Sequence, residues 1–168
     1  MFENRMKFVL SAVVVLSLAL AFAPSAFATT TATATFNVTT SVTNTCTISA
    51  TGLTFAAYNP ANATPDAGTA TLTINCTNYA NYSVALNGGG SGSVTARKMT
   101  NGTYSLGYLL CTTVGCGTIW GDGTGSTVAQ TGTGTGANQT LTVYGQIPIN
   151  EAAISGSYSD TVTATITY

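Results

Sequence analysis

The sequence predicts an all-β protein of the sandwich type, and three observations support this prediction. Several short stretches alternate apolar and polar residues, which is the pattern of a strand with one buried face. Segments rich in Gly, Asn and Ser separate these stretches and are typical of turns. After residue 28, no stretch repeats its apolar residues with the period of a helix. Short strands at turn-marked intervals, in a chain in which only 5% of residues are charged, are typical of a β-sandwich.

The first 28 residues are expected to be an export signal. Arg5 and Lys7 give a basic start, residues 8–23 form an apolar run, and Ala26 and Ala28 supply small residues for cleavage. A membrane anchor is the alternative, but this run is shorter than the roughly 20 residues that span a bilayer. No later segment is long enough to span one. The chain that remains after cleavage is long enough for one domain with its own core.

An unusually long alternating stretch opens the mature chain. Every odd position from 31 to 47 holds Thr, Asn or Ser, and the apolar residues at even positions include Ala32, Ala34, Phe36, Val38 and Val42. An extended run of this length spans about 60 Å at ~3.3 Å per residue, whereas a compact domain of this size is about 37 Å across. Part of the strand is therefore expected to leave its own domain and to pair with another copy. A disordered, Thr-rich leader is the alternative interpretation.

Further strands are expected over residues 69–76, 82–86, 104–111, 139–149 and 156–168, with a flexible turn over 87–93 and a mobile loop or hairpin over 121–138. The last strand places Tyr158, Asp160, Val162, Ala164, Ile166 and Tyr168 on one side. Nothing follows it to cover its edge, and a bare apolar edge promotes association. We interpret the surplus strand at the start and the uncovered edge at the end as two halves of one contact. Such a contact is head to tail, and its repetition gives an open filament.

The four cysteines indicate two disulfides, because the predicted signal sends the chain to an oxidising compartment. Four cysteines allow three pairings. Cys111 and Cys116 are close in sequence with Gly115 between them, so a local bridge is expected there, which leaves Cys46 to pair with Cys76. A zinc site is the alternative, but the chain contains no His.

The composition argues against several other functions. The mature chain carries two basic and four acidic residues, so it has no positive surface for nucleic acid. With no His and no pair of acids close in sequence, we expect neither catalysis nor a metal or cofactor. Asp122 alone is too few carboxylates for calcium, and the Gly-rich run lacks the Gly-Lys-Ser/Thr ending of a phosphate-binding loop. Trp120 and Tyr108 could stack on a sugar, but beside a disulfide hairpin they are expected in the core.

A set of short pieces follows one order along nearly the whole mature chain: TCTIS, LTFAAYNP, GTATLTINCTN, YSVALNGG, ARKM, LGYLLC, IWGDG, VYGQIP and GSYSDTVTATITY. In these pieces the chain resembles the spore coat protein U domain family, which includes the Csu-type subunits of archaic chaperone-usher pili. The resemblance implies an incomplete immunoglobulin-like β-sandwich that lacks its last strand. In that family a periplasmic chaperone lends a strand to the groove, and at the outer-membrane usher the N-terminal extension of the next subunit replaces it.

The resemblance also implies roles for particular residues. A donor extension over 29–42 would precede a sandwich domain over 43–168, and its donor side chains would be Ala32, Ala34, Phe36 and Val38, with Val42 as a further candidate. The acceptor groove and chaperone contact would involve the C-terminal strand, at Tyr158, Val162, Ala164, Ile166 and the carboxylate of Tyr168. The implied function is that of a structural pilus subunit, exported through the periplasm to the cell surface, where it supports adhesion and biofilm formation. A coat protein around a resting cell and a monomeric sugar-binding adhesin are the alternatives.

Overall fold

The computed structural model describes residues 28–168, so the predicted signal sequence and its cleavage lie almost wholly outside the described part. The chain divides into two units, Met1–Thr40 and Ser41–Tyr168. In the first unit, residues 28–40 have no regular secondary structure and their side chains are exposed. The first strand begins only at Cys46, so the long strand expected from residue 31 is not formed in the single chain. A strand needs a neighbour for its backbone hydrogen bonds, and in the described part of this unit, residues 28–40, no second strand is present.

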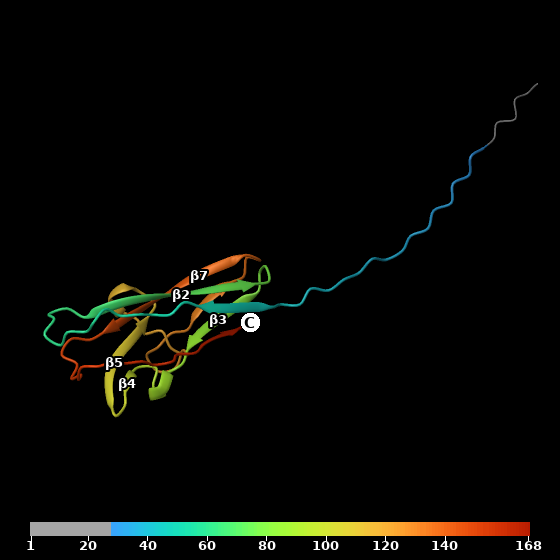
Figure 1. Ribbon diagram of the computed structural model, residues 1–168. Helices are drawn as coiled ribbons and strands as arrows, with labels where there is room; N and C mark the ends of the chain where they lie inside the picture. The colour runs from blue at the N-terminus through green and yellow to red at the C-terminus, as the bar shows by residue number, and fades with distance from the viewer. Residues whose placement is uncertain (1–27) are drawn as a thin grey trace, which may run out of the picture. The chain divides into compact units, whose positions relative to one another are not determined.

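The second unit is a sandwich of two antiparallel sheets (Figure 1). The larger sheet has the order β1-β2-β7-β5-β4, with β1 at Cys46–Ala50, β2 at Asp66–Cys76, β7 at Asn138–Ile147, β5 at Tyr104–Cys111 and β4 at Arg97–Asn101. The smaller sheet has the order β6-β3-β8, with β6 at Gln130–Thr133, β3 at Asn81–Leu86 and β8 at Ala164–Thr167. Two short 3-10 turns, η1 at Gly89–Ser91 and η2 at Val114–Cys116, complete the elements. The prediction of an all-β sandwich is confirmed.

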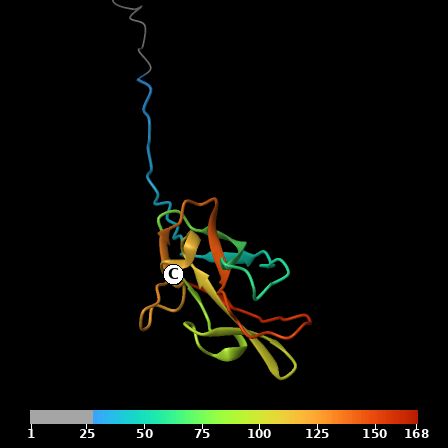
Figure 2. The same ribbon diagram turned by 90° about the vertical axis from the view of Figure 1, so that its left-hand side faces the viewer.

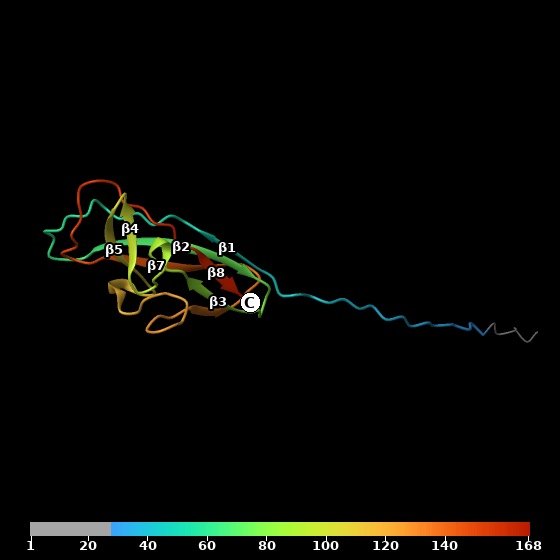
Figure 3. The same ribbon diagram turned by 90° about the horizontal axis from the view of Figure 1, so that it is seen from below.

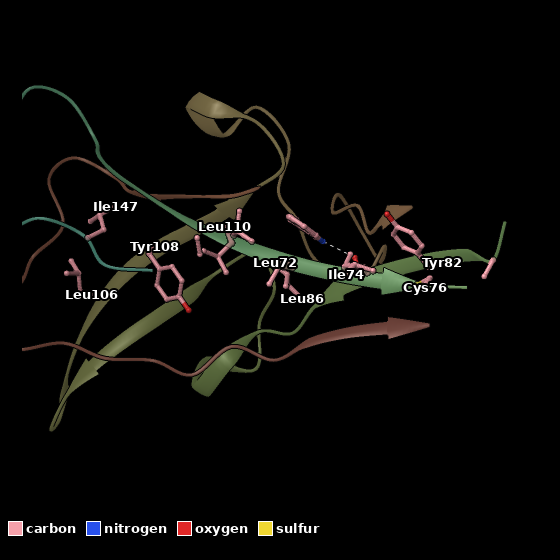
Figure 4. Packing of buried hydrophobic residues seen from close by; sticks show 14 residues of the cluster. Leu72, Ile74, Cys76, Tyr82, Leu86, Leu106, Tyr108, Leu110 and Ile147 are labelled. Carbon is pink, nitrogen blue, oxygen red and sulfur yellow. Dashed lines mark hydrogen bonds between the residues drawn. The ribbon is translucent and has the colours of Figure 1, made fainter. Parts of the chain in front are cut away.

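The core lies between the sheets and comes from the alternating positions of the strands. On β2 the even positions Leu72, Ile74 and Cys76 point into it, and Figure 4 shows them beside Tyr82, Leu86 and Leu110. Trp120 is 1% exposed, and its indole N–H donates to the carbonyl of Val84 at 2.9 Å. Trp120 and Tyr108 therefore belong to the core, as the sequence predicts. Full burial of an aliphatic or aromatic side chain contributes about 1.5–3 kcal/mol, so these residues account for much of the stability.

Both expected disulfides are present. Cys46 and Cys76 are bonded and stand directly opposite each other in the β1–β2 pair. Cys111 and Cys116 close a local loop that contains η2, and Gly115 in this loop has φ of 77°, which favours glycine. The first disulfide fixes the start of β1 to the sheet, and the second fixes the chain that leads to Trp120.

The last segment differs most from the prediction. A strand was expected over 156–168, but β8 covers only Ala164–Thr167. Its partner β3 ends at Leu86, where the chain turns away into η1, so the residues before Ala164 have no strand beside them in the smaller sheet. Figure 3 shows β8 beside β3, with the C-terminus at its end. The Gly-rich region expected as a loop or hairpin contains β6, which pairs with β3.

We predict that the two disulfides differ in their effect on stability. Replacing Cys46 and Cys76 by Ala should lower the free energy of unfolding by about 3–4 kcal/mol, because this bridge closes a loop of 30 residues. Replacing Cys111 and Cys116 by Ala should cost only about 2 kcal/mol, because its loop spans 5 residues. Denaturant unfolding of the two double variants and the parent tests this order. An equal or reversed loss would contradict it.

Candidate functional site

An open groove lies between the two sheets. It has a volume of about 1000 Å³ and runs between β1 with the residues that follow it and β8 with the residues that precede it. Ile48 of β1 and Ile166 of β8 pack against the core but do not line the groove, whereas Ala50 and Ala164 do. The groove therefore begins where β1 and β8 end their close packing and continues away from there.

Apolar side chains form much of the groove, whereas Thr, Ser and Asp residues of the segments that follow β1 and precede β8 also line it. The apolar part comes from core-facing residues of both sheets, including Leu72, Leu106, Leu110, Val143 and Ile147 of the larger sheet and Leu86 of the smaller one. On the side of β8 the wall is made by Val162 and Ala164. A surface of this kind gains free energy when another apolar group covers it, at about 25 cal/mol per Å² removed from water.

Two strand edges flank this apolar surface. β1 is the first strand of the larger sheet and pairs only with β2, and β8 is the last strand of the smaller sheet and pairs only with β3, within residues 28–168. The other edge of each strand thus offers backbone N–H and C=O groups that can accept an added strand. Apolar pockets beside free backbone groups are the two requirements for strand addition.

The end of the groove away from β8 is filled by the chain itself. After β1, Leu53 and Phe55 lie over a pair of glycines, Gly68 and Gly145, which stand opposite each other in β2 and β7. A β-carbon at Gly145 would lie 2.7 Å from Leu53 Cδ1 and 2.8 Å from Phe55 Cζ, closer than real contacts allow. The paired glycines therefore provide the space in which these two side chains cover that part of the core. The ring of Phe55 also meets Tyr108 edge to face, with centroids 6.5 Å apart.

Two polar side chains of the interior, Tyr108 and Arg97, have shifted pKa values. The hydroxyl of Tyr108 donates a hydrogen bond to Asp160 Oδ2 at 2.6 Å, and burial together with this bond raises the pKa of Tyr108 well above its ordinary value. Arg97 is 1% exposed and donates to main-chain carbonyls around it; burial lowers the pKa of its guanidinium from the ordinary value. In the described part of the chain, no three His, Cys, Asp or Glu residues come together as a metal site. The groove thus combines apolar surface with polar side chains and with backbone groups that can pair.

The predicted acceptor residues divide into two groups. Tyr158, Val162 and Ala164 line the groove, whereas Ile166 packs on the core outside it and Tyr168 is 55% exposed. The groove also contains residues that the sequence did not single out, above all Leu53, Phe55, Leu86, Leu106 and Val143. Alternation in the strands marked several of these as buried, but it gave no sign that the cover over them is missing.

The predicted donor residues are all exposed. Phe36 is 85%, Val38 84% and Val42 81% exposed, and Ala32 and Ala34 are exposed as well. Large apolar side chains that alternate with Thr, Asn and Ser, and that have no cover, form the kind of segment that an apolar groove with free strand edges accepts.

Together these features define an immunoglobulin-like all-β sandwich with an open groove between its sheets. The chain belongs to the Spore Coat Protein U domain family, whose model matches residues 32–165. The family prediction made from the sequence is thus confirmed.

Two similar proteins illustrate the relationship. The chain is 33% identical to Protein U of Myxococcus xanthus, over 98% of this chain and 99% of that protein. Its fold is similar to a chain in the crystal structure of the CsuC–CsuE chaperone–tip adhesion subunit pre-assembly complex from archaic chaperone-usher Csu pili of Acinetobacter baumannii. The TM-score is 0.55 at 21% identity, and the match covers 76% of this chain and 40% of the other. This second likeness supports the fold.

We predict that a side chain at residue 145 displaces the cover formed by Leu53 and Phe55. Gly145→Val should lower the free energy of unfolding by about 1–3 kcal/mol, because the added atoms would overlap both side chains. Gly52→Val is the matched control, since a β-carbon there meets nothing within 4 Å. Urea unfolding of both variants provides the comparison. Equal stability of the two variants would argue against the packing of Leu53 and Phe55 over Gly145.

We also predict an alkaline loss of stability that depends on Tyr108. Because the folded state raises the pKa of this phenol, the protonated form stabilises the fold below pH of about 10, and the contribution decreases as the pH rises further. Tyr108→Phe should remove this part of the pH dependence. Tyr104→Phe, a change at an exposed residue of the same strand, should retain it. Unfolding midpoints between pH 8 and 11 test this prediction, and identical pH profiles for the parent and Tyr108→Phe would refute it.

Proposed function

We propose that this protein is a structural subunit of a surface pilus that is assembled by the chaperone-usher pathway through donor-strand exchange. The observation that carries the proposal is the apolar groove between two unpaired strand edges, in a chain that also has an exposed segment of alternating apolar residues. The N-terminal extension of one subunit occupies the groove of the next. The membership in the Spore Coat Protein U domain family supports this reading.

The dimensions of the two parts support the pairing. The rim formed by β8 and its preceding residues, 158–167, would extend over about 33 Å, and the donor residues 32–42 over about 36 Å, at ~3.3 Å per residue. In a strand, alternate side chains face the same side, so the even-numbered donor residues would all enter the groove. Burying Phe36 and Val38 would stabilise each contact by about 1.5–3 kcal/mol per side chain, in addition to the main-chain hydrogen bonds.

The geometry of the proposed contact determines the assembly. The donor segment and the acceptor groove are different surfaces, so each subunit joins the next head to tail and the chain of subunits stays open. Identical or related subunits are therefore the main partners. Before assembly, a periplasmic chaperone covers the groove, and the outer-membrane usher is the place where the donor segment replaces it. The solved complex with a similar fold is a chaperone–subunit pre-assembly complex, which supports a chaperone as a partner.

The place of action follows from the same proposal. The predicted signal exports the chain to the periplasm, and the assembled fibre lies on the cell surface, where its length supports adhesion and biofilm formation. In the described residues, no helix is both long and apolar enough to cross a membrane. The membership in the Spore Coat Protein U domain family and the similarity in fold to a pilus subunit support a structural role.

A second candidate function is a coat layer around a resting cell. The family description and the full-length similarity to Protein U favour it. Both functions can use the same strand donation, so they differ in where the polymer is deposited. Electron microscopy of cells with and without the gene separates them, because a pilus gives thin surface fibres and a coat gives a continuous layer.

We predict that Phe36→Asp in the full chain prevents polymer growth. A carboxylate in an apolar groove has no partner, so the donor segment should lose its anchor. Asn37→Asp is the matched control, because residue 37 lies on the opposite, polar face of the alternating segment.

The measurement is the ladder of SDS-resistant polymers in periplasmic and surface extracts, together with electron microscopy of fibres. We expect polymer ladders from the parent and from Asn37→Asp, and only soluble monomer from Phe36→Asp. Normal fibres from Phe36→Asp would show that residue 36 does not anchor the donor segment.

A further inference from the structure

The segment that leads into β8 changes from one sheet to the other within a few residues. Ser159 forms a two-way backbone bridge with Thr100 of β4, in the larger sheet, with distances of 2.9 and 3.1 Å. Five residues later, Ala164 pairs with Leu86 of β3, in the smaller sheet. Figure 2 shows this segment, in red, next to the yellow hairpin of β4 and β5. Residues 160–163 therefore span the opening between the sheets, beside the groove.

The carboxylate of Asp160 holds this crossing. Its Oδ1 accepts hydrogen bonds from the backbone N–H of Gly90 at 2.8 Å and of Thr161 at 2.7 Å, and its Oδ2 accepts from the Tyr108 hydroxyl at 2.6 Å. Figure 4 shows that the Tyr108 hydroxyl points toward the segment that leads into β8. A single side chain thus joins the lead-in segment, the η1 turn and strand β5. Hydrogen bonds to a charged acceptor are the stronger ones in proteins.

The glycines of the η1 turn make room for this carboxylate. Gly89 has φ of +59°, and a β-carbon there would overlap the Asp160 carboxylate. A β-carbon at Gly90 would lie 3.3 Å from Asp160 Oδ1. The sequence predicts a flexible turn over 87–93, whereas the structure shows Gly89 and Gly90 of this turn packed closely around the Asp160 carboxylate. The η1 turn therefore forms a close-fitting binding site for the Asp160 side chain.

Neighbouring groups extend the support along the rim. The backbone N–H of Asn87 donates to the Thr163 carbonyl at 3.1 Å, and Asn87 Oδ1 accepts from the Thr163 N–H at 2.9 Å. Buried Arg97 donates to the Asn87 carbonyl at 2.9 Å, which fixes Asn87 in turn. Residues 160–163 lie outside the β3–β8 ladder, so one backbone hydrogen bond and the side chain of Asn87 hold Thr163 where the ladder has ended.

From this arrangement we infer that Asp160 is a positioning residue for strand acceptance. Its hydrogen bonds hold the backbone of residues 160–163 in the conformation that an incoming strand needs for pairing. The inference rests on the proposed function and adds to it a residue that acts through the backbone of 160–163. The reason is geometric, because an added strand needs consecutive backbone groups held in line along the whole rim. A rim that moves would lose the hydrogen bonds of its first half. Arg97 and Asn87 then serve as the support behind Asp160.

The test measures how long a donor peptide stays in the groove. A fluorescent synthetic peptide of residues 29–45 is added to the full chain carrying Phe36→Asp, so that its own extension does not compete. Unlabelled peptide then displaces it. The variants are Asp160→Ala, Asp160→Asn and Tyr108→Phe. Asp122→Ala is the matched control, because Asp122 is also an acid that accepts hydrogen bonds in a turn, from Thr124.

Asp160→Ala should release the peptide about tenfold faster, the effect of losing hydrogen bonds to a charged group. Asp160→Asn should stay closer to the parent, because the amide oxygen still accepts from Gly90 and Thr161. Tyr108→Phe should lie between the parent and Asp160→Ala. Asp122→Ala should match the parent. A purely structural effect would lower the unfolding midpoint without this order of release rates.

The outcomes separate the two proposals. If the parent does not retain the peptide, the proposed function is overturned, and the inference with it. If the parent retains the peptide but Asp160→Ala and Tyr108→Phe release it at the parent rate, only the role of Asp160 is overturned. If Asp160→Ala does not fold, the rate for Tyr108→Phe decides, because this variant removes one hydrogen bond and leaves the carboxylate in its seat.

Discussion

The structure depends on a core that its own strands do not fully cover. Within residues 28–168, β1 and β8 each pair with one neighbour, and between them apolar side chains of both sheets line a groove of about 1000 Å³. Unpaired backbone groups and uncovered apolar surface are both costly in water. One added strand would remove both costs together, since its backbone would pair with the free edges while its alternate side chains filled the groove.

The rest of the fold holds this opening in place. The Cys46–Cys76 disulfide fixes the start of β1, and Leu53 and Phe55 close the far end of the groove over the Gly68–Gly145 pair. On the opposite rim, Asp160 links the segment before β8 to the η1 turn and to β5. Specific contacts therefore define both sides of the groove. These contacts distinguish it from a gap that loose packing would leave.

Much of the fold could be predicted from the sequence, because alternation is a local property. It located the cores of β2, β3, β5 and β7, and cysteine spacing located both disulfides. The start of β8 could not be predicted, because it depends on where β3 ends and on contacts that Gly90, Tyr108 and Asn87, which are distant in sequence, make with residues 160–163. The packing of Leu53 and Phe55 over the two glycines was not predicted for the same reason. It depends on the register of the β2–β7 pair, which places Gly68 opposite Gly145. In the N-terminal extension, alternation predicts a strand that the single chain does not form. Such a strand can form only when another molecule provides a strand edge to which the extension pairs.

The central claim is that the edges of β1 and β8 receive a strand from another copy. Amide hydrogen exchange of the full chain, measured before and after assembly, tests it most directly. We expect exchange to slow strongly on assembly in residues 32–42, in β1 and in the rim of residues 158–167, while the interior strands β2 and β7 change little. If assembly leaves exchange at these edges as fast as in the monomer, these edges do not receive a strand.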